Sequence, residues 1–228
     1  AGETLDIGFD FPFYDDSYSE CIINANGWVG FGADNNAWEN LLIPSADAPR
    51  PAIFGFWDDL NPVNDDCDEY CSGEVYYHGN EERFVIWFNE VAHWWNEYPD
   101  SYYNFQIVLY SNGNVNLNYQ SITGIATATI GMQNSTATDA ILISHNFDYA
   151  HNELSIPIDM RAPWLNVNPL ELSVPAGGID NLTVTVDASS LLGGIYFEEL
   201  VINSNDFDNP SVIVPVTVDV GGGTCFGW

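Results

Sequence analysis

The chain has 228 residues, with 33 acidic side chains against three arginines and no lysine, and a net charge of −30 at pH 7. Such a protein repels phosphate backbones and anionic lipid surfaces, which argues against nucleic acid and bare membrane as partners. No run approaches the roughly 20 apolar residues of a membrane-spanning helix, so direct membrane insertion is not expected. Other proteins, glycans and cations remain as partners.

Strand-forming runs separated by Gly, Asn, Asp and Pro recur along the chain, while helical periodicity is nearly absent. This pattern is typical of sandwiches and barrels. Hydrophobic residues make up 46% of the chain, enough to fill real cores. The sequence therefore predicts an all-β protein with two tandem β-sandwich domains, residues 1–160 and 161–220, followed by a Gly-rich hinge and docking tail over 221–228.

The four cysteines are an even number without the spacing of a metal site, which favours disulfides and an oxidising, extracytoplasmic location. Cys67 and Cys71 can close a short loop on themselves. Cys21 and Cys225 would then pair within one chain or between two chains. Because four cysteines allow three pairings, the connectivity stays open.

An acidic segment over residues 58–69 gives the strongest ligand-type pattern, because calcium prefers carboxylate, amide and carbonyl oxygens. The candidate calcium ligands are Asp58, Asp59, Asn61, Asn64, Asp65, Asp66, Asp68 and Glu69. A Cys67–Cys71 disulfide would bring these groups together. The spacing is not that of an EF-hand loop, and the alternative is a solvated surface loop in which Asp58 and Asp59 serve as turn residues.

The run over residues 83–91 is apolar on both faces, which predicts a central strand covered on both sides. Aromatic side chains then concentrate in residues 93–103. Neighbouring tryptophans in an extended chain point to opposite sides, so one of Trp94 and Trp95 should be exposed. With Tyr98 and Tyr102 they form a candidate surface for sugars or a protein partner. The alternative is that this loop folds back as core.

The clearest hairpin joins residues 103–110 to residues 114–119 through Asn112 and Gly113, where the sequence predicts a tight turn with positive φ angles. The returning strand alternates apolar residues with asparagines, which predicts one buried face and one wet face. Asn134 and Asn181 fit the glycosylation pattern, although such matches often arise by chance in a chain rich in Asn, Ser and Thr.

Beyond residues 160–163, shorter strands rich in Val, Leu and Ile are predicted over residues 171–174, 182–186, 195–203 and 212–218. Their spacing suits a small immunoglobulin-like sandwich. In the tail, Cys225, Phe226 and Trp228 supply a covalent anchor and two apolar contacts. A tail that docks on a neighbouring chain would propagate a head-to-tail filament, whereas a tail that docks on its own chain would clasp the two domains.

Seven stretches of the first domain resemble, in order, the nidogen-like extracellular domains and their bacterial relatives: residues 7–14, 24–32, 53–60, 73–77, 84–87, 105–110 and 129–134. This resemblance implies a secreted matrix, adhesion or surface protein that interacts rather than catalyses. Residues 164–169, 174–178, 202–206 and 214–218 are similar to immunoglobulin-like repeats of secreted bacterial proteins, which implies a spacer or stalk.

Catalytic motifs are missing from the sequence: it has no lysine for a phosphate loop or Schiff base, no zinc-protease histidine spacing and no Gly-x-Ser-x-Gly elbow. We therefore expect a secreted, non-catalytic structural or adhesion protein at the cell surface, with a head-to-tail filament subunit as its specific form. The alternative is a calcium-dependent or carbohydrate-binding accessory module of a larger secreted protein.

Overall fold

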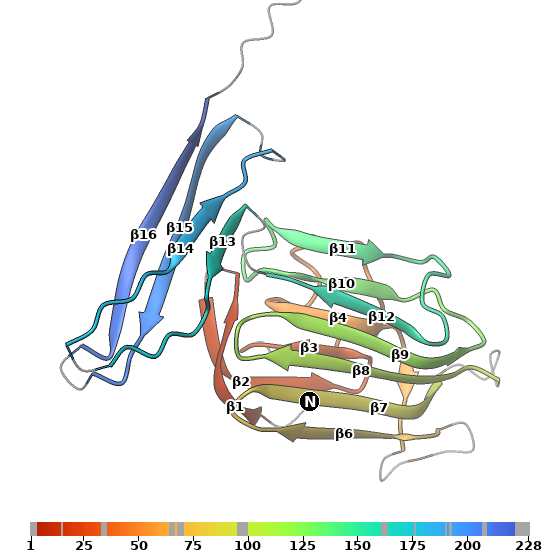
Figure 1. Ribbon diagram of the computed structural model, residues 1–228. Helices are drawn as coiled ribbons and strands as arrows, with labels where there is room; N and C mark the ends of the chain where they lie inside the picture. Colours follow the sequence, from red (N-terminus) through yellow and green to blue (C-terminus); the bar gives the residue numbers. More distant parts are fainter. Residues whose placement is uncertain are drawn as a thin grey trace, which may run out of the picture. The chain divides into compact units, whose positions relative to one another are not determined.

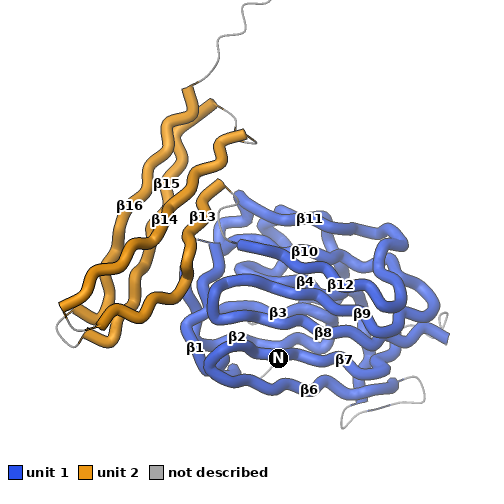
Figure 2. Tube along the Cα trace, viewed as in Figure 1, with its two compact units in different colours: residues 1–160 blue, residues 161–228 orange. Residues whose placement is uncertain are grey.

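The chain folds into strands and turns, without a helix in the part that the structure describes. The computed structural model describes residues 4–14, 16–32, 36–63, 67, 71–94, 100–160, 164–175, 177–189, 191, 193–206 and 209–221. The chain separates into two compact units, residues 1–160 and 161–228 (Figure 2). The all-β prediction is confirmed.

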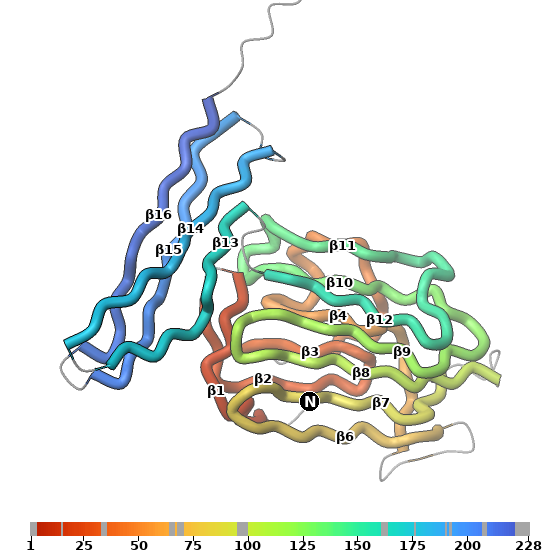
Figure 3. The backbone as a smooth tube through the Cα atoms, viewed as in Figure 1, coloured from red at the N-terminus to blue at the C-terminus, as the bar shows by residue number. Residues whose placement is uncertain are grey.

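The first sheet of unit 1 has six antiparallel strands in the order β1-β2-β3-β4-β10-β11 (Figure 1). Its strands are β1 (Thr4–Phe13), β2 (Asp16–Asn24), β3 (Trp28–Gly30), β4 (Ala52–Trp57), β10 (Thr129–Gln133) and β11 (Ala140–Ser144). The chain leaves this sheet after β4, builds most of the second sheet, and returns with β10 beside β4 (Figure 3). Each sheet is therefore formed by residues far apart in the sequence.

The second sheet has the order β12-β9-β8-β7-β5, and β6 also pairs with β7. Its strands are β5 (Leu60–Asn61), β6 (Glu74–Gly79), β7 (Arg83–His93), β8 (Tyr102–Tyr110), β9 (Val115–Thr123) and β12 (Leu154–Ile158). One residue in two points inward along these strands, as the pleat requires. Phe88 and Phe105 stack in the core with ring centroids 4.5 Å apart.

A second, smaller core lies on the other face of the first sheet, where residues 36–51 pack over β3 and β4. Trp28, Phe54 and Trp57 are fully buried there beside Ile43. The indole N–H groups of Trp28 and Trp57 both donate to the carbonyl oxygen of Ala37, at 3.0 and 3.1 Å. This segment is thus a fixed cover rather than a loose connection.

The predicted central strand over residues 83–91 forms β7, but the expectation that both its faces are covered is wrong. Phe84, Ile86 and Phe88 are buried, whereas Val85 and Trp87 are only half-buried. The sandwich has two sheets, so its second sheet buries one face between the layers and leaves the other toward solvent. The apolar residues at positions 85 and 87 therefore belong to a surface.

The hairpin of β8 and β9 is confirmed, with a longer turn than predicted. Tyr110 N–H donates to Asn114 O at 3.0 Å, and Gly113 N–H donates to Tyr110 O at 2.9 Å. Gly113 has a φ of +87°, while Asn112 does not have a positive φ. A three-residue hairpin loop needs only one residue in the left-handed region, and glycine supplies it without strain.

Unit 2 contains two antiparallel strand pairs, β13 (Leu165–Asn168) with β14 (Thr183–Val186) and β15 (Gly194–Asn203) with β16 (Ser211–Val220). The prediction of a strand over residues 171–174 is wrong, because these residues lie outside the strand ladder. The partner of β14 is β13, in which Leu165 pairs with Val186 and Val167 pairs with Val184. Many apolar side chains of this unit stay exposed, among them Phe197 at 71%.

Candidate functional site

The first candidate site is the turn between β4 and β5, which carries Asp58 and Asp59. Asn26 holds this turn: its carbonyl accepts from Asp58 N–H at 3.3 Å, and its side-chain oxygen accepts from Leu60 N–H at 3.0 Å. Asp58 in turn accepts from Asp59 N–H through Oδ1 at 2.9 Å. Asp58 therefore acts as a turn residue, one of the two roles considered from the sequence.

An acid–base pair lies beside this turn. Asp58 Oδ1 is 3.6 Å from His93 Nε2, and both side chains are largely shielded, at 14% and 10% exposure. Burial raises the pKa of Asp59, and the neighbouring carboxylate of Asp58 adds to this, while His93 acts in the opposite direction. The pair places a carboxylate beside an imidazole at the end of β7.

Trp94 projects from the same end of β7. Its backbone N–H donates to Asp59 O at 2.8 Å, while its side chain is 51% exposed. Tyr102, 37% exposed at the start of β8, pairs through the backbone with Ala92 of β7, two residues before Trp94. We call Asp58, His93, Trp94 and Tyr102 the Trp94 end. Trp95 and Tyr98 lie outside the described residues.

Three of the eight predicted calcium ligands can be placed. Asp58 faces His93, Asp59 is half-buried in the turn, and Asn61 is 3% exposed within β5. Asn64, Asp65, Asp66, Asp68 and Glu69 lie outside the described residues. Within the described ranges, no group of three His, Cys, Asp or Glu side chains is placed to hold a metal. Calcium binding stays a prediction.

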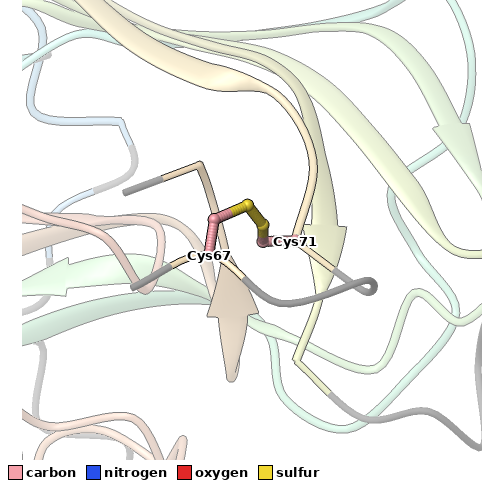
Figure 4. Close-up of a disulfide and its surroundings, with 2 residues drawn as sticks. All are labelled: Cys67 and Cys71. Atoms are coloured by element: carbon pink, nitrogen blue, oxygen red, sulfur yellow. A yellow bond between two sulfur atoms is a disulfide. The ribbon is translucent and has the colours of Figure 1, made fainter. Parts of the chain in front are cut away.

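The loop between β5 and β6 is closed by the Cys67–Cys71 disulfide, with the two Cα atoms 5.7 Å apart (Figure 4). Its base is fastened by hydrogen bonds from Val63 N–H to Gly73 O at 2.8 Å and from Ser72 N–H to Asn61 O at 3.0 Å. The short-range pairing of these two cysteines is thus as predicted. The disulfide closes the loop, and the Ser72–Asn61 hydrogen bond fastens its C-terminal side to β5.

Cys21 is a free thiol, buried in the core at 1% exposure. Burial raises the pKa of this thiol to about 12, so it is held in the protonated form that neither attacks disulfides nor binds metals. This setting disfavours the predicted bond to Cys225. Cys225, Phe226 and Trp228 lie outside the described residues, and the docking of the tail stays a prediction.

The two predicted glycosylation sites differ in access. Asn134 is 9% exposed, and its side-chain oxygen accepts from the N–H groups of Thr138 and Asp139 at 3.0 and 3.2 Å. Its nitrogen donates to Thr138 Oγ1 at 3.2 Å. A glycan on this nitrogen would require the 134–139 turn to open. Asn181 is exposed and stays a candidate.

The structure also brings together a hydroxyl and an imidazole that sequence patterns did not indicate. Thr129 Oγ1 and His145 Nδ1 are 2.8 Å apart. Thr129 is fully buried, however, and its hydroxyl donates to Leu41 O at 2.9 Å. Because that proton is already committed to a backbone carbonyl, His145 acts as the donor, and the pair ties loops together instead of activating a nucleophile.

Comparison with known proteins identifies a family for most of the chain. Residues 1–157 match the family described as NIDO related, which suggests a domain of the extracellular type. No curated protein and no solved structure matches the chain. Within its described ranges the chain has no helix long and apolar enough to cross a bilayer. With more than two thirds of its residues matched, the chain belongs to the NIDO-related family.

Proposed function

We propose that this chain is a secreted, non-catalytic adhesion protein that binds a protein partner through the Trp94 end. The observation that carries the proposal is the combination of an exposed tryptophan side chain with a fixed backbone. Trp94 is 51% exposed, and its N–H is bonded to Asp59 O at 2.8 Å. A rigid aromatic anchor loses little conformational entropy when a partner covers it.

The surroundings of Trp94 support a binding role. Asp58 and His93 form a polar pair next to it, and the exposed Tyr102 starts β8 at the end of the sheet where β7 leads to Trp94. Energetically important contacts at protein interfaces are enriched in Trp, Tyr and Arg surrounded by polar groups. The family match and the Cys67–Cys71 disulfide support an extracellular location.

Head-to-tail assembly is the specific form of adhesion that we propose, with the tail of one subunit docked on the next. The buried, protonated thiol of Cys21 argues for a non-covalent contact, made by Phe226 and Trp228, over a bond from Cys225 to Cys21. Repulsion between subunits with a charge of −30 would make such assembly weaker at low salt. The second unit, proposed to be immunoglobulin-like, would serve as the spacer.

The test is analytical ultracentrifugation of the whole chain under non-reducing conditions, over a range of concentration and salt. We expect self-association that weakens in Trp94→Ala. Trp38→Ala is the matched control, because Trp38 is 55% exposed in the same unit but belongs to the cover of the first sheet. A monomer at all concentrations, or equal effects of the two substitutions, would contradict the proposal.

A second candidate function is that of a carbohydrate-binding accessory module. It is favoured by the polar outer face of the second sheet, where half-buried Trp87 lies among asparagine and glutamine side chains.

A further inference from the structure

We propose that the outer face of the second sheet is a binding site for a neutral oligosaccharide. This inference rests on the second candidate function, to which it assigns a site, and it is independent of adhesion through the Trp94 end.

One row of side chains crosses five strands of the second sheet. Backbone pairing joins Tyr76 to Trp87, Trp87 to Gln106, Gln106 to Asn118, and Asn118 to Ser155. Residues paired in this way project to the same face of a sheet. We call these five residues the amide row. At the usual strand spacing of ~4.8 Å it extends over roughly 19 Å, long enough for a short oligosaccharide.

The row faces away from the core. The residues next to it in β7, β8 and β9 are buried between the sheets, including Phe88, Phe105 and Tyr119. Over the middle of the row lies a hollow of about 260 Å³, and its polar lining comes from Asn104, Gln106, Asn118, Gln120 and Glu153. Trp87 lines it as well. A ligand on this face would therefore lie in a concave site, as small-molecule sites usually are.

The tryptophan of the row, next to Tyr76 at its end, is held in a single orientation. Trp87 Nε1 donates to Asn104 Oδ1 at 2.8 Å. Asn104 is 6% exposed, and its amide nitrogen donates to Asn89 and Glu90 at 3.3 and 3.2 Å. The Tyr76 ring lies beside the indole, with centroids 5.6 Å apart. Fixed aromatic faces offer the apolar half of a sugar site, against which the C–H groups of a sugar ring can stack.

The amides supply the polar half. Ser155 Oγ donates to Asn118 Oδ1 at 2.8 Å, and Asn116 Oδ1 lies 3.3 Å from the same hydroxyl. Within the described ranges neither asparagine nitrogen has a hydrogen-bond partner, so both can donate to a ligand. In the part of the chain that the structure describes, the Gln106 side-chain amide makes no hydrogen bond. An amide both donates and accepts, and a pair of neighbouring sugar hydroxyls does the same. The row is thus matched to neutral hydroxyl groups.

The charges around the row decide the class of sugar. Glu153 lines the hollow and Glu90 lies behind Asn104. Arg83 lies four residues from Trp87 along β7, about 13 Å at the rise of an extended strand, and pairs with Tyr110 at the far end. Among the described residues, the charges placed at the row are therefore carboxylates, which repel sialylated, uronic or sulfated glycans. A neutral oligosaccharide is the ligand that fits.

The test is isothermal titration of the whole chain with neutral fragments of cellulose, xylan, mannan and chitin, and with sialylated and sulfated glycans. We expect one or more neutral fragments to bind and the anionic glycans not to bind. Gln106→Ala and Asn118→Ala should each weaken binding by about tenfold, the loss of a typical net hydrogen bond. Asn181→Ala, an exposed amide in unit 2, is the matched control and should leave affinity unchanged.

The outcomes separate this inference from the adhesion proposal. Binding that is lost in Trp94→Ala but intact in Gln106→Ala and Asn118→Ala would place the sugar at the Trp94 end and overturn the inference. A preference for anionic glycans, or no binding to any glycan, would overturn it too. In the last case Trp94-dependent self-association would still support adhesion, so the two proposals can fail separately.

Discussion

The hydroxyl of Tyr119 in β9 donates a 2.6 Å hydrogen bond to the carbonyl oxygen of Gly55 in β4, across the core between the two sheets. Tyr119 is 1% exposed. Gly55 allows this close approach, because a Cβ at that position would lie 2.5 Å from Ile107 Cγ1. The bond joins the two layers at a point where no water can replace it.

Replacing Tyr119 by Phe removes the donor and leaves the Gly55 carbonyl without its partner in the core. We expect the free energy of unfolding to fall by about 1–3 kcal/mol, the usual penalty for an unsatisfied buried polar group. Urea denaturation followed by tryptophan fluorescence measures this. Tyr149→Phe is the control, because Tyr149 is 42% exposed. Equal stability of both variants would show that the sheet-to-sheet bond contributes little.

Alkaline pH should destabilise the fold through its buried tyrosines. Burial raises the pKa of Tyr103 and Tyr119 above the ordinary value of 10.0. Below that value both phenols are protonated in the folded and unfolded states, so they cause no pH dependence. Above it the unfolded chain loses protons that the folded chain retains, and the fall in stability approaches about 1.4 kcal/mol per pH unit for each phenol.

The measurement is the free energy of unfolding as a function of pH on both sides of the ordinary tyrosine pKa. Tyr119→Phe should show a shallower fall than the wild type, because one of the two phenols is gone. The same slope in both proteins would mean that Tyr119 ionises in the folded state.

Asp59 allows a test of the predicted calcium site. Burial raises the pKa of Asp59, so the folded protein disfavours the charged carboxylate. The stability that the protonated form contributes is therefore lost as pH rises through the folded pKa. Asp59→Asn should therefore stabilise the calcium-free protein slightly at neutral pH. If calcium binds here, the ion should raise the Tm of the wild type and have less effect on Asp59→Asn.

Differential scanning calorimetry with calcium and with a chelator provides the comparison. Asp47→Asn, an exposed carboxylate in the cover of the first sheet, is the control for the general effect of reduced negative charge. A Tm that calcium raises equally in all three proteins would indicate screening of the net charge and argue against a site at Asp59.

Cys21 should be unreactive in the native protein. Its thiol is buried and its pKa is raised to about 12, so almost no thiolate is present at neutral pH. We expect alkylating reagents to modify Cys21 only after unfolding, and non-reducing peptide mapping to recover the Cys67–Cys71 link with Cys21 free. A native Cys21–Cys225 link would contradict this. Between chains it would favour a covalent polymer, and within one chain it would favour a monomer with an internal link.

Several features were available in the sequence because they depend on neighbours along the chain. Alternating apolar residues predicted β9, and Gly113 predicted its turn, since a glycine in a hairpin loop accepts a positive φ. The short spacing of Cys67 and Cys71 predicted their disulfide. Such signals need no knowledge of the partner strand.

The tertiary structure decided which of these local features meet. Cross-strand register placed Trp87, Gln106 and Asn118 in line, although they come from three separate strands. Because the second sheet packs through one face only, the outer side of β7 faces solvent. Tertiary packing also buried Cys21 in the core. The side chain of Asn134 is hydrogen-bonded within its own turn. Strand register and burial depend on contacts between residues distant in sequence, and alternation along a single strand is the same whichever face becomes the core.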